Sequence, residues 1–265
     1  MNRHRWKLFV VPFVVFMVLG SVEPKPPSPA EPPKPAAESP PPEASGAPPA
    51  TPPTVAEDGW IPYRYYPLLY TGKILLTLAA VWLYRSGLAE FAPPRVSLLA
   101  LAVGLLGGVV WIVICRLNLE QRLLEPLGLG SLVGLGQRSA FNPLVELADR
   151  PLAAWGFLAV RFLGLVAVVP LIEELFLRGF LVRFITAPDW WKVPFGTASR
   201  AALVAATVVP MLMHPAELFA AAVWFSAVSW LMVRTRNFWD CVAAHALTNL
   251  VLGIYVVTSG DWRLM

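Results

Sequence analysis

The stretch AAWGFLAVRFLGLVAVVPLIEELFLRGFLVRFITA, residues 153–187, decides the fold. Its side chains are overwhelmingly apolar, yet Glu173, Glu174 and Arg178 stand together in its second half. A helix of about 20 apolar residues crosses the ~30 Å hydrocarbon core of a bilayer, and this stretch is much longer. We therefore predict a membrane helix that either projects into water or breaks near Pro170 into two spans.

Further apolar runs on both sides of this stretch predict more membrane helices. Lipid cannot satisfy open backbone groups, so each span must be a helix. With an apolar run near the N-terminus, the count is seven spans, or eight if the long stretch breaks. The predicted fold is an all-α, polytopic helical bundle, and its other runs are 68–84, 96–115, 201–213, 216–233 and 239–257.

The composition also favours a membrane protein. Hydrophobic residues make up 57% of the chain and charged residues 14%, whereas soluble domains are about one-quarter charged. We expect a multi-pass protein of the inner membrane, with the lipid bilayer as its surroundings. The net charge is only +4, and the basic residues are scattered singly between apolar runs, which excludes a nucleic-acid-binding stripe. Cys115 and Cys241 both lie in apolar runs, so neither a disulfide framework nor a thiolate zinc site is expected.

Three segments differ in composition. Residues 1–22 have a basic start followed by an apolar run, as in an N-terminal anchor or signal peptide. Residues 23–59 are rich in proline, with 14 prolines between positions 23 and 54, and we expect a disordered linker there. Residues 60–265 form the predicted membrane-embedded domain.

The ionisable residues inside the long apolar stretch require a structural or functional explanation, because a charged side chain in the bilayer costs free energy. Glu174 and Arg178 are four residues apart, so on a helix they share a face and can pair. Glu173 lies about 100° around the helix and is left without the arginine. A carboxylate kept from water and from a cation is suited to act as a general base.

Three more polar residues lie near or within later apolar runs. His245 and Asn249 are four residues apart on one predicted helix, where an imidazole and an amide can both donate to a developing oxyanion. His214 stands on another helix, just before Pro215. It can share a water molecule with Glu173 if the helices pack together.

These residues, in this order, resemble the CPBP intramembrane proteases, relatives of the eukaryotic CAAX prenyl endopeptidase and of bacteriocin-immunity proteins. The resemblance rests on the pattern EExxxR at residues 173–178, the later His214, and HxxxN at residues 245–249. It covers about residues 150–257. It implies an endopeptidase whose substrate is a membrane-associated protein or peptide, for example one with a C-terminal lipid or sorting signal.

Carried over residue by residue, the resemblance implies that Glu173 and His214 activate a water molecule. His245 and Asn249 would stabilise the oxyanion, and Glu174 and Arg178 would support the site. No serine or cysteine lies beside a base in these helices, so we expect no covalent intermediate. The sequence departs from the family pattern at Pro210, four residues before His214, where the family usually has phenylalanine.

Other interpretations stay open. Glu173, His214 and His245 could hold zinc, although the resemblance implies a protease that needs no cofactor. Pro210 could mark an inactive binding or immunity-type protein of the same fold. A transporter would show an internal repeat, which the sequence lacks. The tract Trp60-Ile61-Pro62-Tyr63 is similar to a CAAX-protease-related subgroup found beside exosortase systems, which suggests such a sorting system as a partner.

Overall fold

The computed structural model describes residues 6–24, 60–91, 93–130 and 140–265, and every regular element in these ranges is helical. The predicted all-α class is therefore confirmed for the described residues. The α-helices are α1 (Trp6–Gly20), α2 (Tyr66–Tyr84), α3 (Leu98–Arg116), α4 (Leu119–Leu124), α6 (Pro143–Glu146), α7 (Pro151–Leu163), α8 (Val169–Glu174), α9 (Val182–Thr186), α10 (Arg200–Met213), α11 (Leu218–Thr235) and α12 (Phe238–Ser259).

Shorter helical pieces extend or connect these helices. Two are π-helical, Gly164–Val168 and Leu175–Leu181. The others are 3₁₀-helical turns: Tyr63–Tyr65, Arg85–Phe91, Glu125–Leu127, Trp190–Lys192, Pro215–Glu217 and Trp262–Leu264.

The predicted break near Pro170 does not occur. Helices α7, α8 and α9 and the two π-helical pieces form one continuous helix of 36 residues, Pro151–Thr186. A proline interrupts an α-helix because it lacks an N–H and its ring crowds the preceding turn. Here a π-helical turn directly precedes Pro170 and accommodates it, so the chain runs on in one direction.

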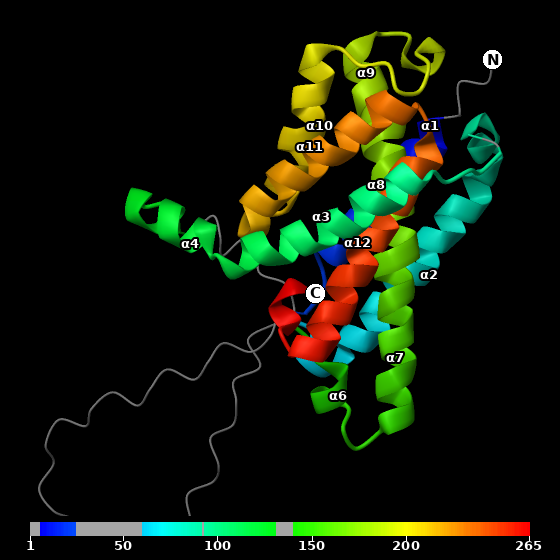
Figure 1. Ribbon diagram of the computed structural model, residues 1–265. Helices are drawn as coiled ribbons and strands as arrows, with labels where there is room; N and C mark the ends of the chain where they lie inside the picture. The colour runs from blue at the N-terminus through cyan, green and yellow to red at the C-terminus, as the bar shows by residue number, and fades with distance from the viewer. Residues whose placement is uncertain (1–5, 25–59, 92, 131–139) are drawn as a thin grey trace, which may run out of the picture.

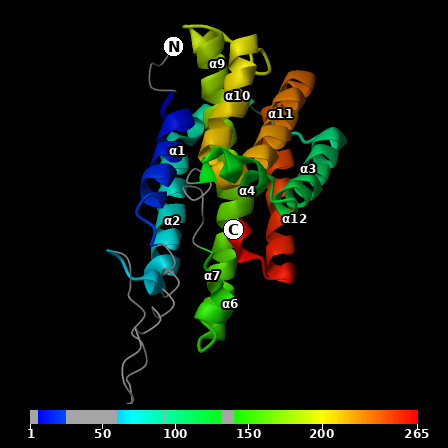
Figure 2. The same ribbon diagram turned by 90° about the vertical axis from the view of Figure 1, so that its left-hand side faces the viewer.

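This long helix forms the middle of the bundle. In Figure 2, α1 and α2 lie on one side of it, and α3, α11 and α12 lie on the other. Helix α10 lies beside its C-terminal half in Figures 1 and 2. Side chains of the long helix therefore meet several partner helices, and those near its centre are removed from solvent.

The outer surface is apolar over much of its area. Large side chains such as Leu75, Trp82, Leu106, Leu152 and Leu212 are more than half exposed. A surface with so many exposed large apolar groups matches lipid better than water. Multiple apolar helices of this kind indicate a multi-pass membrane protein.

The predicted number of seven to eight spans is wrong. Among the described residues, five helical segments are long and apolar enough to cross a membrane, namely Tyr63–Phe91, Leu98–Arg116, Pro151–Thr186, Pro215–Thr235 and Phe238–Ser259. The other two apolar helices, α1 and α10, have only 15 and 14 residues. At ~1.5 Å per residue each is about 20 Å long, short of the ~30 Å core.

The division of the chain at residues 22 and 59 stays a prediction. Helix α1 packs against one side of the bundle through one face, on which Leu8 and Phe9 are each 1% exposed. A Cβ atom at Gly179 would lie only 2.6 Å from Phe9, so the glycine permits this close approach. The proline-rich linker predicted for residues 23–59 lies outside the described residues, apart from Glu23 and Pro24.

Helices α3 and α12 pack closely over small residues. A Cβ atom at Gly104 would lie 2.7 Å from the carbonyl oxygen of Ala244, and one at Gly108 would lie 2.8 Å from Val251. The two glycines are four residues apart, which is the spacing that lets membrane helices approach each other. Thr248 of α12 also donates a hydrogen bond to the Gly104 carbonyl at 2.8 Å.

We expect Gly104→Ala to destabilise the bundle by about 1–3 kcal/mol, because the new methyl group overlaps the backbone of α12. The matched control is Gly156→Ala, also in a helix, where a Cβ atom meets nothing within 4 Å. The control should lose no stability, since alanine is the better helix former. Thermal unfolding of both variants in detergent checks this, and equal unfolding temperatures would contradict it.

Candidate active site

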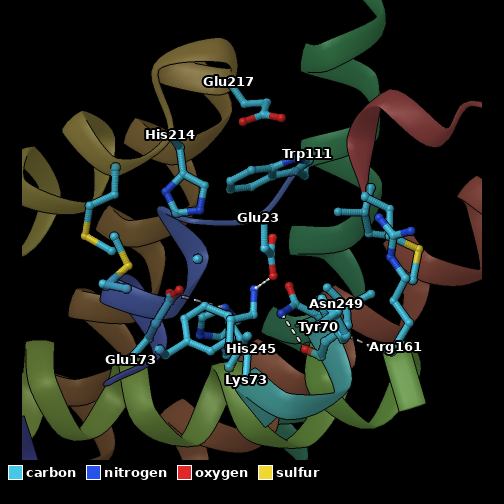
Figure 3. Close-up of a pocket in the computed structure, with 18 of the residues that line it drawn as sticks. Glu23, Tyr70, Lys73, Trp111, Arg161, Glu173, His214, Glu217, His245 and Asn249 are labelled. Carbon is cyan, nitrogen blue, oxygen red and sulfur yellow. Dashed lines mark hydrogen bonds and ion pairs between the residues drawn. The ribbon is translucent and has the colours of Figure 1, made fainter. Parts of the chain in front are cut away.

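A cavity of about 350 Å³ lies inside the bundle, and all four predicted catalytic residues line it. Glu173 comes from α8, His214 follows α10, and His245 and Asn249 come from α12. Figure 3 shows Glu173 and His245 at one end of the cavity, with His214 and Trp111 at the other. Groups from three distant parts of the sequence thus reach one shared cavity.

The predicted pair between Glu174 and Arg178 is confirmed. Arg178 Nη1 donates to Glu174 Oε1 at 3.0 Å, and both side chains are fully buried. Arg178 Nη2 also donates to the carbonyl of Phe225 at 3.1 Å and to Ser229 Oγ at 3.5 Å. The pair therefore ties the long helix to α11.

His245 lies between the two glutamates. Its Nδ1 atom is 3.0 Å from Glu174 Oε1, the same oxygen that accepts from Arg178. Because a carboxylate oxygen accepts, Nδ1 carries the hydrogen, and Nε2 is turned to Glu173, 3.9 Å from Oε2. The rings of Trp224 and Phe225 lie edge-on to the imidazole. The orientation of His245 is thus set by Glu174.

Glu173 has the character expected of the free carboxylate. It is 6% exposed, and its Oε2 atom has no hydrogen-bond partner among the described residues. A buried polar atom without a partner is rare and costly. Glu173 itself lines the cavity, where a water molecule or a substrate could bind.

His214 lies at the end of α10. Its Nδ1 atom is 2.8 Å from the carbonyl oxygen of Pro210, one turn earlier. A carbonyl only accepts, so the hydrogen of the neutral ring is on Nδ1 and Nε2 is the basic nitrogen. The rings of Trp111 and Phe225 hold the imidazole at centroid distances of 5.8 and 5.6 Å. Pro210, the departure from the family pattern, therefore orients this histidine through its carbonyl.

Asn249 compensates for Pro170. The N–H of Val169 bonds to the carbonyl of Gly164 in the π-helical pattern. The next donor in that pattern would be residue 170, a proline, which leaves the carbonyl of Leu165 without its helical partner. Asn249 Nδ2 donates to that carbonyl at 2.8 Å. One of the two amide hydrogens of Asn249 is used in this way.

The predicted catalytic residues lie around one cavity, but their contacts differ in part from those that the sequence suggested. Glu173 Oε2 lies 3.9 Å from His245 Nε2, whereas the sequence suggested that Glu173 shares a water molecule with His214. His245 and Asn249 share a face of α12 and both line the cavity, as expected from their spacing. His245 bonds to Glu174 and Asn249 bonds to the long helix, so both are held firmly.

Sequence reasoning missed several polar residues of the cavity. Lys73, Glu23 and Glu217 line it, and each is buried or nearly so. Lys73 could have been found, because it is a single lysine inside the apolar run 68–84. Arg161 has no carboxylate partner among the described residues and donates instead to the carbonyl of Phe141 at 2.6 Å.

The residues do not fit the zinc alternative. Within the described ranges, no group of three His, Cys, Asp or Glu side chains is close enough together to hold a metal ion. The Glu173, His214 and His245 side chains therefore do not form a ligand set, and no step below is derived through a metal.

A comparison with protein families finds one match. Residues 155–251 match the Rce1-like family, described as type II CAAX prenyl endopeptidase Rce1-like. This range contains every predicted site residue, and it lies inside the 150–257 region of the expected resemblance. Comparisons with curated proteins and with solved structures found no match.

We expect Glu174→Gln to lower stability by about 3–5 kcal/mol, because it leaves the buried Arg178 guanidinium without its counter-ion. The control is Asp189→Asn, which breaks the Lys192–Asp189 pair at 2.7 Å, where both side chains are more than half exposed. Such surface pairs contribute about 0–1 kcal/mol. Thermal unfolding in detergent compares the two variants, and a Glu174→Gln protein as stable as the control would refute the structural role of the pair.

Proposed function

Residues 155–251 form an Rce1-like, type II CAAX prenyl endopeptidase domain, a family that suggests an intramembrane protease, and from this premise we propose the chemistry of the site. The protein hydrolyses a peptide bond in a membrane-associated protein or peptide. The attacking group is a water molecule, and no covalent intermediate forms. The observation that carries the proposal is Glu173, a buried carboxylate with an unbonded oxygen, in the wall of the cavity that the other three predicted catalytic residues also line.

Glu173 is the proposed general base. It takes a proton from the water molecule while the water oxygen bonds to the carbonyl carbon of the scissile peptide bond. The family resemblance implies that His214, which lines the same cavity, supports this water. The proton held by Glu173 then passes to the leaving nitrogen as the C–N bond breaks, which yields a carboxylic acid and an amine.

His245 and Asn249 are the proposed oxyanion donors. Glu174 holds His245 by Nδ1, so Nε2 is the ring atom free to approach the reacting centre. When both ring nitrogens carry hydrogen, Nε2 donates to the developing oxyanion. Asn249 offers its second amide hydrogen, the first being bonded to Leu165. Donors that are fixed before reaction stabilise the transition state without a cost of reorganisation.

Glu174 and Arg178 are positioning residues in this proposal. They do not line the cavity, but Glu174 sets the orientation of His245, and Arg178 neutralises Glu174. This agrees with the supporting role that the family resemblance implies.

An inactive immunity-type protein is the second candidate, and Pro210 is the observation that favours it. The carbonyl of Pro210 nevertheless bonds to His214 and orients its ring toward the cavity. The departure thus leaves the proposed machinery in place, which favours an active protease.

The substrates and location follow from the same proposal. The family implies protein substrates, and the cavity lies within the apolar bundle, so the substrate reaches it from the membrane. We propose the inner membrane as the location. An exosortase-type sorting system is a proposed partner, because of the tract that begins at Trp60, a side chain 99% exposed.

Replacement of the proposed base tests the mechanism. We expect Glu173→Gln to lower the kcat of peptide cleavage in proteoliposomes by about two to four orders of magnitude, the usual contribution of a general base. Glu125→Gln, at an exposed glutamate outside the cavity, should keep full activity. Circular dichroism confirms that both variants are folded. Full activity of Glu173→Gln would falsify the assignment.

Metal removal tests the zinc alternative. We expect cleavage to continue unchanged after dialysis against EDTA, because the site lacks a ligand set. Initial rates are compared before dialysis, after it, and after addition of zinc. Activity that disappears with the chelator and returns with zinc would replace the proposed mechanism with a metal-dependent one.

A further inference from the structure

The cavity contains a buried lysine that the proposed hydrolysis does not use. Lys73 of α2 is 5% exposed, and its ammonium lies near the aromatic rings of Phe16 and Tyr70, at 4.3 and 4.7 Å from their centroids. Its Nζ atom forms an ion pair with Glu23 Oε1 at 2.5 Å. Figure 3 shows Lys73 reaching toward Glu23 near Glu173 and His245.

If the Lys73–Glu23 ion pair served only to stabilise the fold, its desolvation would cost more free energy than that role justifies. Two charges removed from water lose much of their hydration, and an apolar pair of similar volume is often as stable or more so. A lysine kept at such a place in a membrane protein is a functional-site candidate, and its partner points to the ligand. The partner here is a carboxylate.

The cations near Lys73 outnumber the anions that pair with them. Arg161 lines the same cavity, is 2% exposed and donates to a backbone carbonyl. Its guanidinium also lies over the rings of Tyr66 and Trp262. Lys73 and Arg161 are thus the two cations of a wall that also carries the carboxylates of Glu23, Glu173 and Glu217, and Glu23 is the carboxylate paired to Lys73.

Glu23 is joined to the rest of the protein by a short, exposed piece of chain. Helix α1 ends at Gly20, and Ser21 and Val22 are exposed. The side chain of Glu23 is 16% exposed, more than that of Lys73. Departure of Glu23 from Lys73 would break the backbone hydrogen bond from Glu23 N–H to the Gly20 carbonyl at 3.3 Å and move the buried Pro24, a change at the end of α1.

We propose that the Lys73 ammonium binds a carboxylate of the substrate peptide, and that Glu23 occupies this site in the resting protein. The proposal rests on the function proposed above, since it names the substrate group that lies beside the hydrolytic residues. The carboxylate is either the C-terminus of the peptide or an acidic side chain. Substrate binding exchanges one carboxylate for another, so the lysine is never left buried without a partner.

Because one carboxylate replaces another, the Lys73 ammonium stays paired both in the resting protein and in the complex with substrate. Entry of a neutral peptide would have to leave Glu23 in place or strand the ammonium, whereas an anionic peptide replaces Glu23 directly. The cavity thus discriminates by charge as well as by apolar fit, since an unpaired buried charge penalises the wrong ligand.

Peptide binding to the Glu173→Gln protein tests the proposal without cleavage. Three probes are titrated calorimetrically into full-length protein in detergent: N-acetyl-Ala-Val-Leu-Leu with a free carboxylate, the same peptide as C-terminal amide, and N-acetyl-Ala-Val-Glu-Leu amide. We expect at least one of the two anionic peptides to bind about tenfold more tightly than the neutral amide, the size of one charge-assisted hydrogen bond. The anionic peptide that binds more tightly than the neutral amide shows whether the carboxylate comes from the C-terminus or from an acidic side chain.

Variants of the ion pair then locate the effect. Lys73→Gln combined with Glu23→Gln should abolish the preference for the anionic peptide, whereas Lys73→Arg should keep it. Glu23→Gln alone should tighten binding of the anionic peptide several-fold and leave the neutral amide unchanged. Lys192→Gln, at an exposed lysine outside the cavity, is the control and should behave as the parent. Unfolding temperatures show whether each variant is folded.

The possible failures can be told apart. Equal binding of all three peptides, no binding of any, or a preference that survives in the Lys73→Gln, Glu23→Gln protein overturns the carboxylate site. If wild-type protein still cleaves peptides in that case, the proposed protease function stands. If the anionic preference depends on Lys73 but wild-type protein cleaves nothing, the carboxylate site stands and the protease function falls.

Discussion

The candidate site depends on one buried oxygen atom. Glu174 Oε1 accepts from Arg178 and from His245, both at 3.0 Å. Arg178 in turn bonds to α11, and His245 belongs to α12, so three helices meet at this atom. A carboxylate buried in an apolar bundle must be neutralised and hydrogen-bonded to be tolerated, and these two donors do both. The same bonds turn His245 Nε2 toward Glu173.

A second constraint comes from Pro170. The proline removes a backbone donor from the middle of the long helix, and Asn249 supplies a side-chain donor in its place. This bond positions the amide beside the cavity and joins α12 to the long helix one turn after His245. His245 and Asn249, which we propose for catalysis, therefore also connect α12 to the long helix. Their hydrogen bonds hold these polar side chains in fixed positions within a bundle of apolar helices.

Some features of the helices follow from the local sequence, whereas others depend on contacts between helices. Hydropathy predicted where the apolar helices lie, because each depends on its own residues. It overestimated the number of spans, since α1 and α10 are apolar but too short, and since the π-helical turn before Pro170 avoids a break. Pro170 is visible in the sequence, but the bond from Asn249 to the Leu165 carbonyl joins residues 84 positions apart and could not be read from the local pattern.

The sequence by itself determined the all-α membrane fold, the Glu174–Arg178 pair, the exclusion of Glu173 from that pair, and the common face of His245 and Asn249. These follow from apolar content and from the 3.6-residue turn, which act within one helix. Only the tertiary structure decided that His245 lies between both glutamates, that His214 is oriented by Pro210, and that Glu23 reaches Lys73. The polar contacts of His245 with the two glutamates and of Lys73 with Glu23 join residues 50 or more positions apart. The rotation and depth at which helices pack depend on whole helix surfaces and not on the spacing of a few residues. His214 bonds within its own turn, and its ring also packs against Trp111 and Phe225, which the spacing could not predict.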